Sequence, residues 1–121
     1  MNIFILAFTS ILMSVAAQFS LKAGMTEIKM AVPSTEPFGM NMLLAFLTNK
    51  FLIIGFLLYG LGAVVWLSVL AKWDVSKAYP LVGLGFLLSV VVGFALGEEV
   101  TLARGLGVLL IVSGVFIITG S

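Results

Sequence analysis

The chain has 121 residues, of which 62% are hydrophobic and 9% charged, and its mean hydropathy is +1.30. A domain of this size cannot bury so much apolar surface in water, so the composition excludes a small soluble domain and indicates a membrane protein. The net charge of +1, without a basic cluster, excludes a nucleic-acid partner, and the absence of cysteine and histidine removes thiolate chemistry and the usual base at neutral pH.

Four segments are apolar over the roughly 20 residues that a membrane helix needs. Backbone groups in lipid must form hydrogen bonds within their own segment, so these segments are expected to be helices. The sequence therefore predicts an all-α membrane protein, an antiparallel bundle of four transmembrane helices that forms a single domain over residues 1–121. The expected spans cover residues 3–23, 51–71, 78–97 and 102–120.

The long connection, residues 24–50, separates the first two spans. Pro33 and Pro37 argue against one continuous helix there. Its second half, "FGMNMLLAFLTN", is apolar but too short to cross a membrane. We expect either an interfacial or re-entrant helix in this part or an irregular loop.

The first span carries four polar residues at intervals of four, which predicts a polar stripe: Ser10, Ser14, Gln18 and Lys22. Two interpretations compete. The serines and the amide form hydrogen bonds across a helix interface while Lys22 reaches the headgroups. Alternatively, the stripe lines a substrate path, with Lys22 binding an anionic group such as a phosphate and with Ser14 and Gln18 contacting the headgroup.

Acidic residues are missing from the middle of every expected span. A proton-coupled exporter of organic cations needs a buried carboxylate that either a proton or the cation can occupy. The charge pattern therefore favours a substrate that carries a phosphate over an organic cation.

The second span places Gly55, Tyr59, Gly62 and Trp66 on one face, which fits helix packing as well as a ligand path. If the path exists, Tyr59 and Trp66, together with Tyr79 at the start of the third span, are candidates for its wall.

The third span opens with "KAYPLVGLGF". Pro80 removes a backbone donor and Gly83 and Gly85 loosen the next turn, so we expect a kink, which is either a hinge for alternating access or a static bend.

The fourth span contains a track of small residues, Ala103, Gly107 and Gly114. Small residues allow close contact between membrane helices, so this track is the expected dimer interface. Four helices without an internal repeat are too few to enclose a path, which indicates a homodimer or a heterodimer with a similar small subunit.

The sequence contains no catalytic triad, metal-ligand cluster, phosphate-binding loop or dinucleotide fingerprint. We therefore expect no enzymatic activity, no cofactor and no metal.

These spans together resemble the drug/metabolite transporter superfamily in its four-helix form. "GVLLIVSGV" is similar to the dimerisation motif of small multidrug resistance proteins, and "GFALGEEVTLARGLGVLLIVSGV" to the last helix pair of EamA-type transporters. "SVAAQFSLKAG" and "VSKAYPLVGLGF" resemble most closely the small flippase subunits that move undecaprenyl-phosphate-linked aminoarabinose.

Two departures separate this chain from the multidrug pumps. Ser14 stands where those pumps carry an essential glutamate, and Val82 stands nearest to the position of their third-helix tryptophan. The resemblance thus implies a multi-pass flippase of the inner membrane, surrounded by membrane lipids, for a polyprenyl-phosphate-linked sugar. The alternatives are a small multidrug-type exporter of organic cations or metabolites, and a non-transporting scaffold subunit of a glycolipid-modifying system.

Overall fold

The computed structural model describes residues 2–31 and 39–121, and these residues form helices and connections without any β-strand. The elements in chain order are α1 (Ile3–Ala31), α2 (Met40–Thr48), α3 (Lys50–Leu70), α4 (Val75–Ala78), the 3₁₀ helix η1 (Tyr79–Val82), α5 (Gly83–Ala95) and α6 (Leu102–Thr119). The predicted all-helical fold is confirmed.

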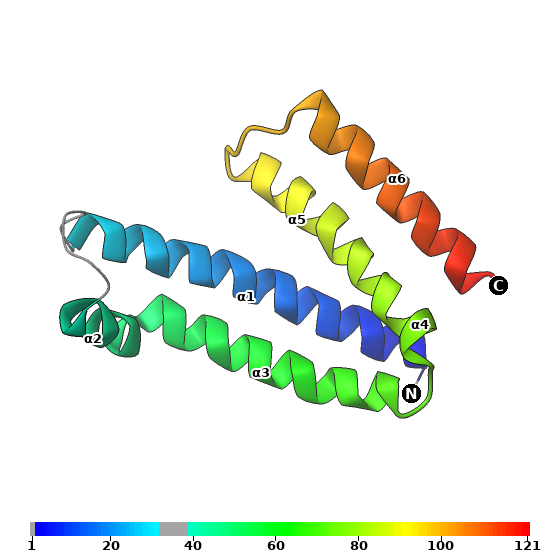
Figure 1. Ribbon diagram of the computed structural model, residues 1–121, viewed down its shortest axis with the longest axis horizontal. Helices are drawn as coiled ribbons and strands as arrows, with labels where there is room; N and C mark the ends of the chain where they lie inside the picture. Colours follow the sequence, from blue (N-terminus) through cyan, green and yellow to red (C-terminus); the bar gives the residue numbers. More distant parts are fainter. Residues whose placement is uncertain (1, 32–38) are drawn as a thin grey trace.

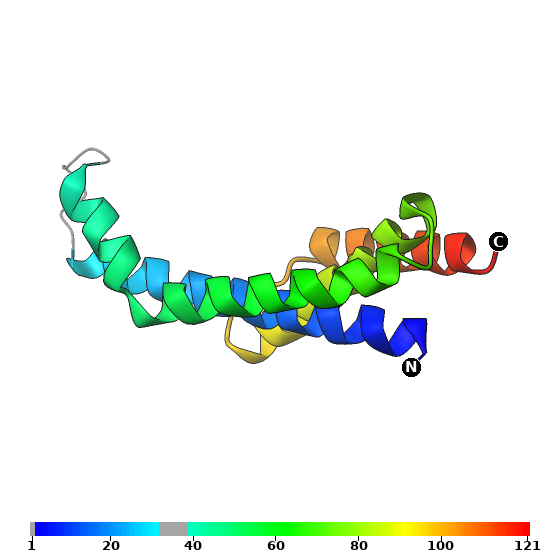
Figure 2. The ribbon, with the colours of Figure 1, turned by 90° about the horizontal axis from the view of Figure 1, so that it is seen from below.

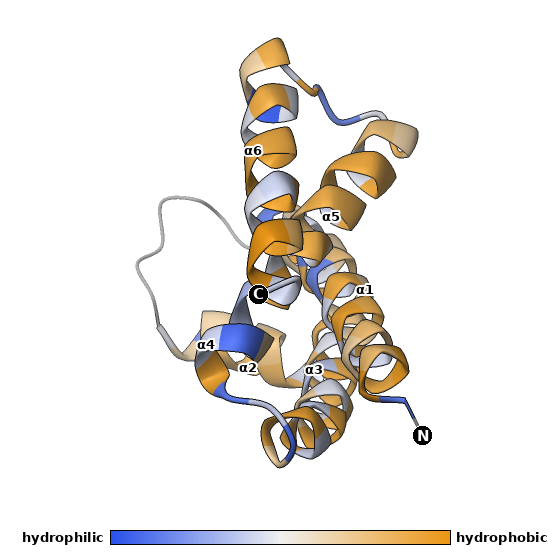
Figure 3. Ribbon diagram, turned by 90° about the vertical axis from the view of Figure 1, so that its right-hand side faces the viewer, coloured by the Kyte–Doolittle hydropathy of each residue, from blue (hydrophilic) through white to orange (hydrophobic). Residues whose placement is uncertain are grey.

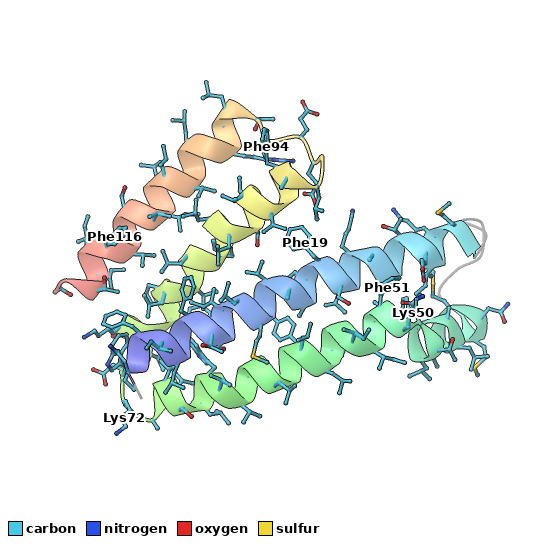
Figure 4. All side chains as sticks on the ribbon, turned by 180° about the vertical axis from the view of Figure 1, so that it is seen from behind. Phe19, Lys50, Phe51, Lys72, Phe94 and Phe116 are labelled. Carbon is cyan, nitrogen blue, oxygen red and sulfur yellow. The ribbon has the colours of Figure 1, made fainter. Side chains whose placement is uncertain are left out.

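Among the described residues, four segments are long and apolar enough to cross a membrane: Ile3–Met30, Lys50–Leu70, Val75–Ala95 and Leu102–Thr119. The third of these is composite, because α4, η1 and α5 follow one another without a break. Figure 3 shows hydrophobic residues along the long helices and hydrophilic residues mainly at the short helix α4 and in the connection between α5 and α6. Lysines stand near both ends of α3, Lys50 at its start and Lys72 just beyond its end (Figure 4). The chain is therefore a multi-pass membrane protein.

The helices form two hairpins that diverge from each other (Figure 1). One hairpin consists of α1 and α3, which run antiparallel along most of their lengths. The other consists of α5 and α6, and α6 packs against α5 and η1. Both termini lie at the end of the molecule where α3 passes into α4, and the connection between α5 and α6 lies on the opposite side (Figures 1 and 2).

Small residues at intervals of seven bring α1 and α3 together. On α1 the residues are Ser10, Ala17 and Gly24, all buried, and on α3 they include Gly55 and Gly62. A Cβ added at Gly55 would lie 3.2 Å from the Ala17 carbonyl oxygen, and one added at Gly62 would lie 3.4 Å from that of Ser10. Because lipid supplies no hydrophobic force between membrane helices, such close backbone contact is what holds the pair together.

The first helix does not end near residue 23, as the sequence predicted, but continues to Ala31. Residues 24–31 contain no proline, and the side chain of Ile28 is 3% exposed, so tertiary packing supports the extra turns. The expected connection is correspondingly shorter and contains the nine-residue helix α2, which has no buried residue. The interfacial position of α2 stays a prediction, and Pro33 and Pro37 lie outside the described residues.

The fourth span begins at Leu102 as predicted, and the remaining ends of the second, third and fourth spans differ from the prediction by one to three residues. Helix α3 begins at Lys50 because the Asn49 side chain accepts hydrogen bonds from the backbone N–H groups of Phe51 and Leu52, at 3.0 and 3.1 Å. The third span begins at Val75 rather than 78 and ends at Ala95 rather than 97.

Candidate functional site

A crevice opens between α1, α3 and η1, and it contains four of the predicted substrate-binding residues. We call it the aromatic crevice. Its volume is about 190 Å³. The lining residues are Ser10, Ile11, Ser14, Tyr59, Gly62, Ala63, Trp66, Tyr79 and Val82.

The aromatic crevice lies at membrane depth. Tyr59 stands nine residues beyond Lys50, which at 1.5 Å per residue places it about 14 Å into α3, close to the centre of a hydrocarbon core roughly 30 Å thick. Neither Tyr59 nor Tyr79 has a hydrogen-bond partner for its hydroxyl within the described ranges, and the two residues are 45% and 65% exposed. A hydroxyl group that faces lipid requires a hydrogen-bond partner, so the crevice presents polar groups to which a ligand or a second chain can bind.

The four residues of the predicted stripe do not share one face. Ser10 is buried, and its hydroxyl donates to the Gly62 carbonyl oxygen of α3 at 2.6 Å. Ser14 lines the aromatic crevice and donates to the carbonyl oxygen of Ile11 on its own helix at 3.0 Å. Gln18 and Lys22 are both exposed.

Helix geometry explains why the prediction of a single stripe was wrong. At 3.6 residues per turn, each step of four residues overshoots a full turn by about 40°. Over the three steps from Ser10 to Lys22 the direction therefore rotates by about 120° around α1. The helix-interface interpretation fits Ser10, while the orientation of Ser14 leaves the path interpretation open.

Lys22 lies in a second, more polar depression that we call the charged mouth. It has a volume of about 330 Å³ and is lined by Lys22, Glu98, Glu99, Thr101 and Arg104. Lys22 follows Ser14 by eight residues on α1, so it lies about 12 Å along the helix from the aromatic crevice. Within the part of the chain that the structure describes, no ion pair engages the Lys22 ammonium group.

The predicted hinge residues occupy packed positions. Pro80 lies in η1, so the third span departs from α-helical geometry where the sequence suggested a kink. Gly83 faces Ile111 of α6, since an added Cβ would lie 2.8 Å from its Cγ2 atom, and Gly85 faces Ile11 of α1 at 3.2 Å. These glycines let α5 approach both neighbours, and hinge motion stays a prediction.

The small-residue track on α6 faces open space. Ala103 is exposed and Gly107 and Gly114 are half-buried. A Cβ added at either glycine would meet no heavy atom within 4 Å. The glycine track is therefore not used for contact within this chain, and its role as a dimer interface stays a prediction.

Sequence reasoning missed three residues that fix this arrangement. Ser20 donates to the Phe51 carbonyl oxygen at 2.6 Å and joins α1 to α3. Arg104 was assigned no binding role, yet it lies in the charged mouth. Asn49 caps α3 and donates from Nδ2 to Glu27 Oε2 at 3.0 Å. An asparagine directly before an apolar run is a recognisable capping signal, but nothing in the sequence shows which face of α1 meets α3.

Comparison with known proteins identifies several relatives. A protein of Pseudomonas savastanoi pv. phaseolicola, named "Probable 4-amino-4-deoxy-L-arabinose-phosphoundecaprenol flippase subunit ArnE", is 43% identical over 74 residues, which cover 60% of this chain and 65% of that protein. The ArnE subunit of Enterobacter sp. (strain 638) is 35% identical over 71 residues, covering 58% of this chain and 66% of that protein. The corresponding ArnF subunit of Proteus mirabilis is 28% identical over 117 residues, covering 93% of this chain and 88% of that protein.

This chain is homologous to the ArnE and ArnF flippase subunits. The resemblance expected from the sequence is thereby confirmed. The match spans less than two thirds of the length of these two ArnE relatives. No protein-family model and no solved structure matches the chain.

Proposed function

We propose that this chain is one subunit of a flippase that moves a polyprenyl-phosphate-linked sugar across the inner membrane. The observation that carries the proposal is the aromatic crevice, an opening with unpartnered hydroxyl groups at the depth of the hydrocarbon core. Its occurrence in a homologue of 4-amino-4-deoxy-L-arabinose-phosphoundecaprenol flippase subunits supports a headgroup as its occupant. The chain acts as a transporter and not as an enzyme.

Different groups of the protein contact different parts of the lipid during translocation. The Lys22 ammonium group binds the phosphate at the charged mouth, because an unpaired cation at the edge of the membrane attracts it. Ser14 and Gln18 contact the headgroup, and Tyr59, Trp66 and Tyr79 form the wall along which it passes. The polyprenyl tail stays in lipid, beside apolar side chains that project outward from α5 and α6, such as Phe94 and Phe116 (Figure 4).

A second chain completes the path. The two hairpins diverge, so one chain does not surround a headgroup on all sides (Figure 1). A Cβ added at Gly107 or Gly114 would meet no heavy atom within 4 Å, and Ala103 is exposed. A homodimer or a heterodimer with a similar subunit forms on this face. Bending at Pro80, Gly83 and Gly85 would let the access to the crevice alternate.

The experiment compares two lysines of α1. In proteoliposomes that contain the 4-amino-4-deoxy-L-arabinose-linked undecaprenyl phosphate, we expect Lys22→Ala to lower the flipping rate and the affinity for the lipid. Lys29→Ala removes the same charge from an exposed position two turns further along the helix and should change neither. Equal effects of the two substitutions would reduce Lys22 to a general surface charge, and wild-type protein that neither binds nor flips the lipid would refute the proposed function.

The rival transport function is the export of organic cations. The carboxylates of Glu27, Asp74, Glu98 and Glu99 all lie near helix ends or in connections, so none is available in the middle of a span. The scaffold alternative predicts binding of the lipid without flipping in any pairing of subunits.

A further inference from the structure

The charged mouth carries both signs of charge. Lys22 and Arg104 contribute two cations, and Glu98 and Glu99 contribute two carboxylates, so the formal charges of the lining cancel. Lys22 comes from α1, the glutamates from the connection after α5, and Arg104 from the first turn of α6. Because these four charges sum to zero, the lining does not favour a ligand that carries only negative charge, such as a phosphate.

The Glu98 carboxylate is positioned by the way α5 ends. Gly97 has a φ of +94°, which only glycine adopts without strain. The N–H of Glu98 donates to the Gly93 carbonyl oxygen at 2.8 Å, and that of Gly97 to the Phe94 carbonyl oxygen at 3.1 Å, which is the Schellman pattern. A Cβ added at Gly93 would lie 3.0 Å from Glu98 Oε1, so the carboxylate rests against the bare backbone of α5.

The other side of the connection is also fixed by hydrogen bonds. The Thr101 hydroxyl oxygen accepts from the Arg104 backbone N–H at 3.1 Å and caps α6. The Arg104 guanidinium donates from Nη1 to the Glu99 carbonyl oxygen at 2.8 Å. One guanidinium offers five N–H donors, so most of this group remains free to bind a ligand. Backbone and side-chain hydrogen bonds therefore hold the Glu98 carboxylate and the Arg104 guanidinium in the lining that they share with Lys22 and Glu99.

We infer that Glu98 and Glu99 of the charged mouth recognise an ammonium group on the sugar, while Lys22 and Arg104 bind the phosphate. The inference rests on the proposed function and assigns the residues that determine its specificity for an amino sugar. A phosphate without an ammonium group gains from the cations but is repelled by the carboxylates at close range. A headgroup with both charges gains from all four residues, so the carboxylates discriminate against the carrier lipid without an amino sugar.

The test compares three lipids on the purified protein in nanodiscs. The probes are 4-amino-4-deoxy-L-arabinose-linked undecaprenyl phosphate, its N-acetylated form, which lacks the ammonium charge, and undecaprenyl phosphate alone. We expect the wild type to bind the amino form about fivefold more tightly than the other two, the factor typical of a partly exposed charge pair. Titration followed by native mass spectrometry measures the three affinities.

Charge-neutral variants assign the preference to the carboxylates. Glu98→Gln combined with Glu99→Gln should abolish the preference and leave binding of the N-acetylated lipid no weaker than in the wild type. Asp74→Asn removes one negative charge from an exposed residue directly before α4, which lies away from the α5–α6 connection (Figure 1), and should keep the preference. Lys22→Gln should weaken all three lipids together.

Three results would overturn the inference. They are equal wild-type affinities for the amino and N-acetylated lipids, a preference that survives in the double glutamine variant, and a preference that is lost equally in Asp74→Asn. In each of these cases the lipid still binds, so the proposed function stands. If the wild type binds none of the three lipids, both the inference and the proposed function fail.

Discussion

A single methyl group at Gly55 tests whether close backbone contact holds α1 against α3. In Gly55→Ala the new Cβ would lie 2.7 Å from Leu21 Cδ2 and 3.2 Å from the Ala17 carbonyl oxygen. Ordinary contact between carbon atoms begins at about 3.5 Å, so Leu21 must move and the two helices must separate slightly. Overpacking of this kind costs about 1–3 kcal/mol.

Gly60→Ala is the matched control. Gly60 lies on the same helix, and a Cβ added there would meet no heavy atom within 4 Å. Replacing glycine by alanine within a helix contributes up to about 1 kcal/mol of stability through helix propensity. Both variants gain this free energy, so it cancels when their free energies of unfolding are compared. We therefore expect Gly55→Ala to be less stable than Gly60→Ala by about 1–3 kcal/mol.

Equilibrium unfolding in mixed micelles, followed by far-UV circular dichroism as the fraction of denaturing detergent rises, measures this difference. Each variant is compared with the wild type in the same detergent. If the two alanine variants have the same free energy of unfolding, the α1–α3 seam is looser than its distances indicate, and the reasoning about small residues is wrong.

Two further predictions concern assembly and transport. Gly107→Leu or Gly114→Leu should disrupt both the dimer and flipping. A large side chain separates the two helix backbones, and no hydrophobic force in lipid compensates for the lost contacts. Leu109→Ala should have a smaller effect. Crosslinking of cysteines placed at Gly114 checks this, and a transport-competent protein in which they never join two chains would rule out this interface. Because Ser14 replaces the pump glutamate, we expect no proton-driven uptake of quaternary ammonium compounds in proteoliposomes, and a pH-driven signal abolished by mutating one acidic residue would contradict this.

The sequence by itself determined the number and type of the long elements. Segments of about 20 apolar residues have no alternative in lipid to the helix, because each backbone donor and acceptor must be satisfied internally. Local signals also specify two helix starts, although the prediction did not use them, since Asn49 caps α3 and Thr101 caps α6 through their own side chains. These features depend on neighbouring residues only and can be recognised without knowledge of the fold.

Only the tertiary structure decided which faces of the helices contact each other. A helix that is apolar all round gives no periodicity to identify its inner face, because lipid and protein interior are equally apolar. The sequence therefore placed Ser10 and Lys22 on one stripe, whereas packing puts the first against α3 and the second in the charged mouth. The approach of Glu98 and Arg104 to Lys22 depends on how the second hairpin docks on α1. That docking is set by close contacts of individual small residues, such as Gly85 against Ile11, which composition and spacing do not specify.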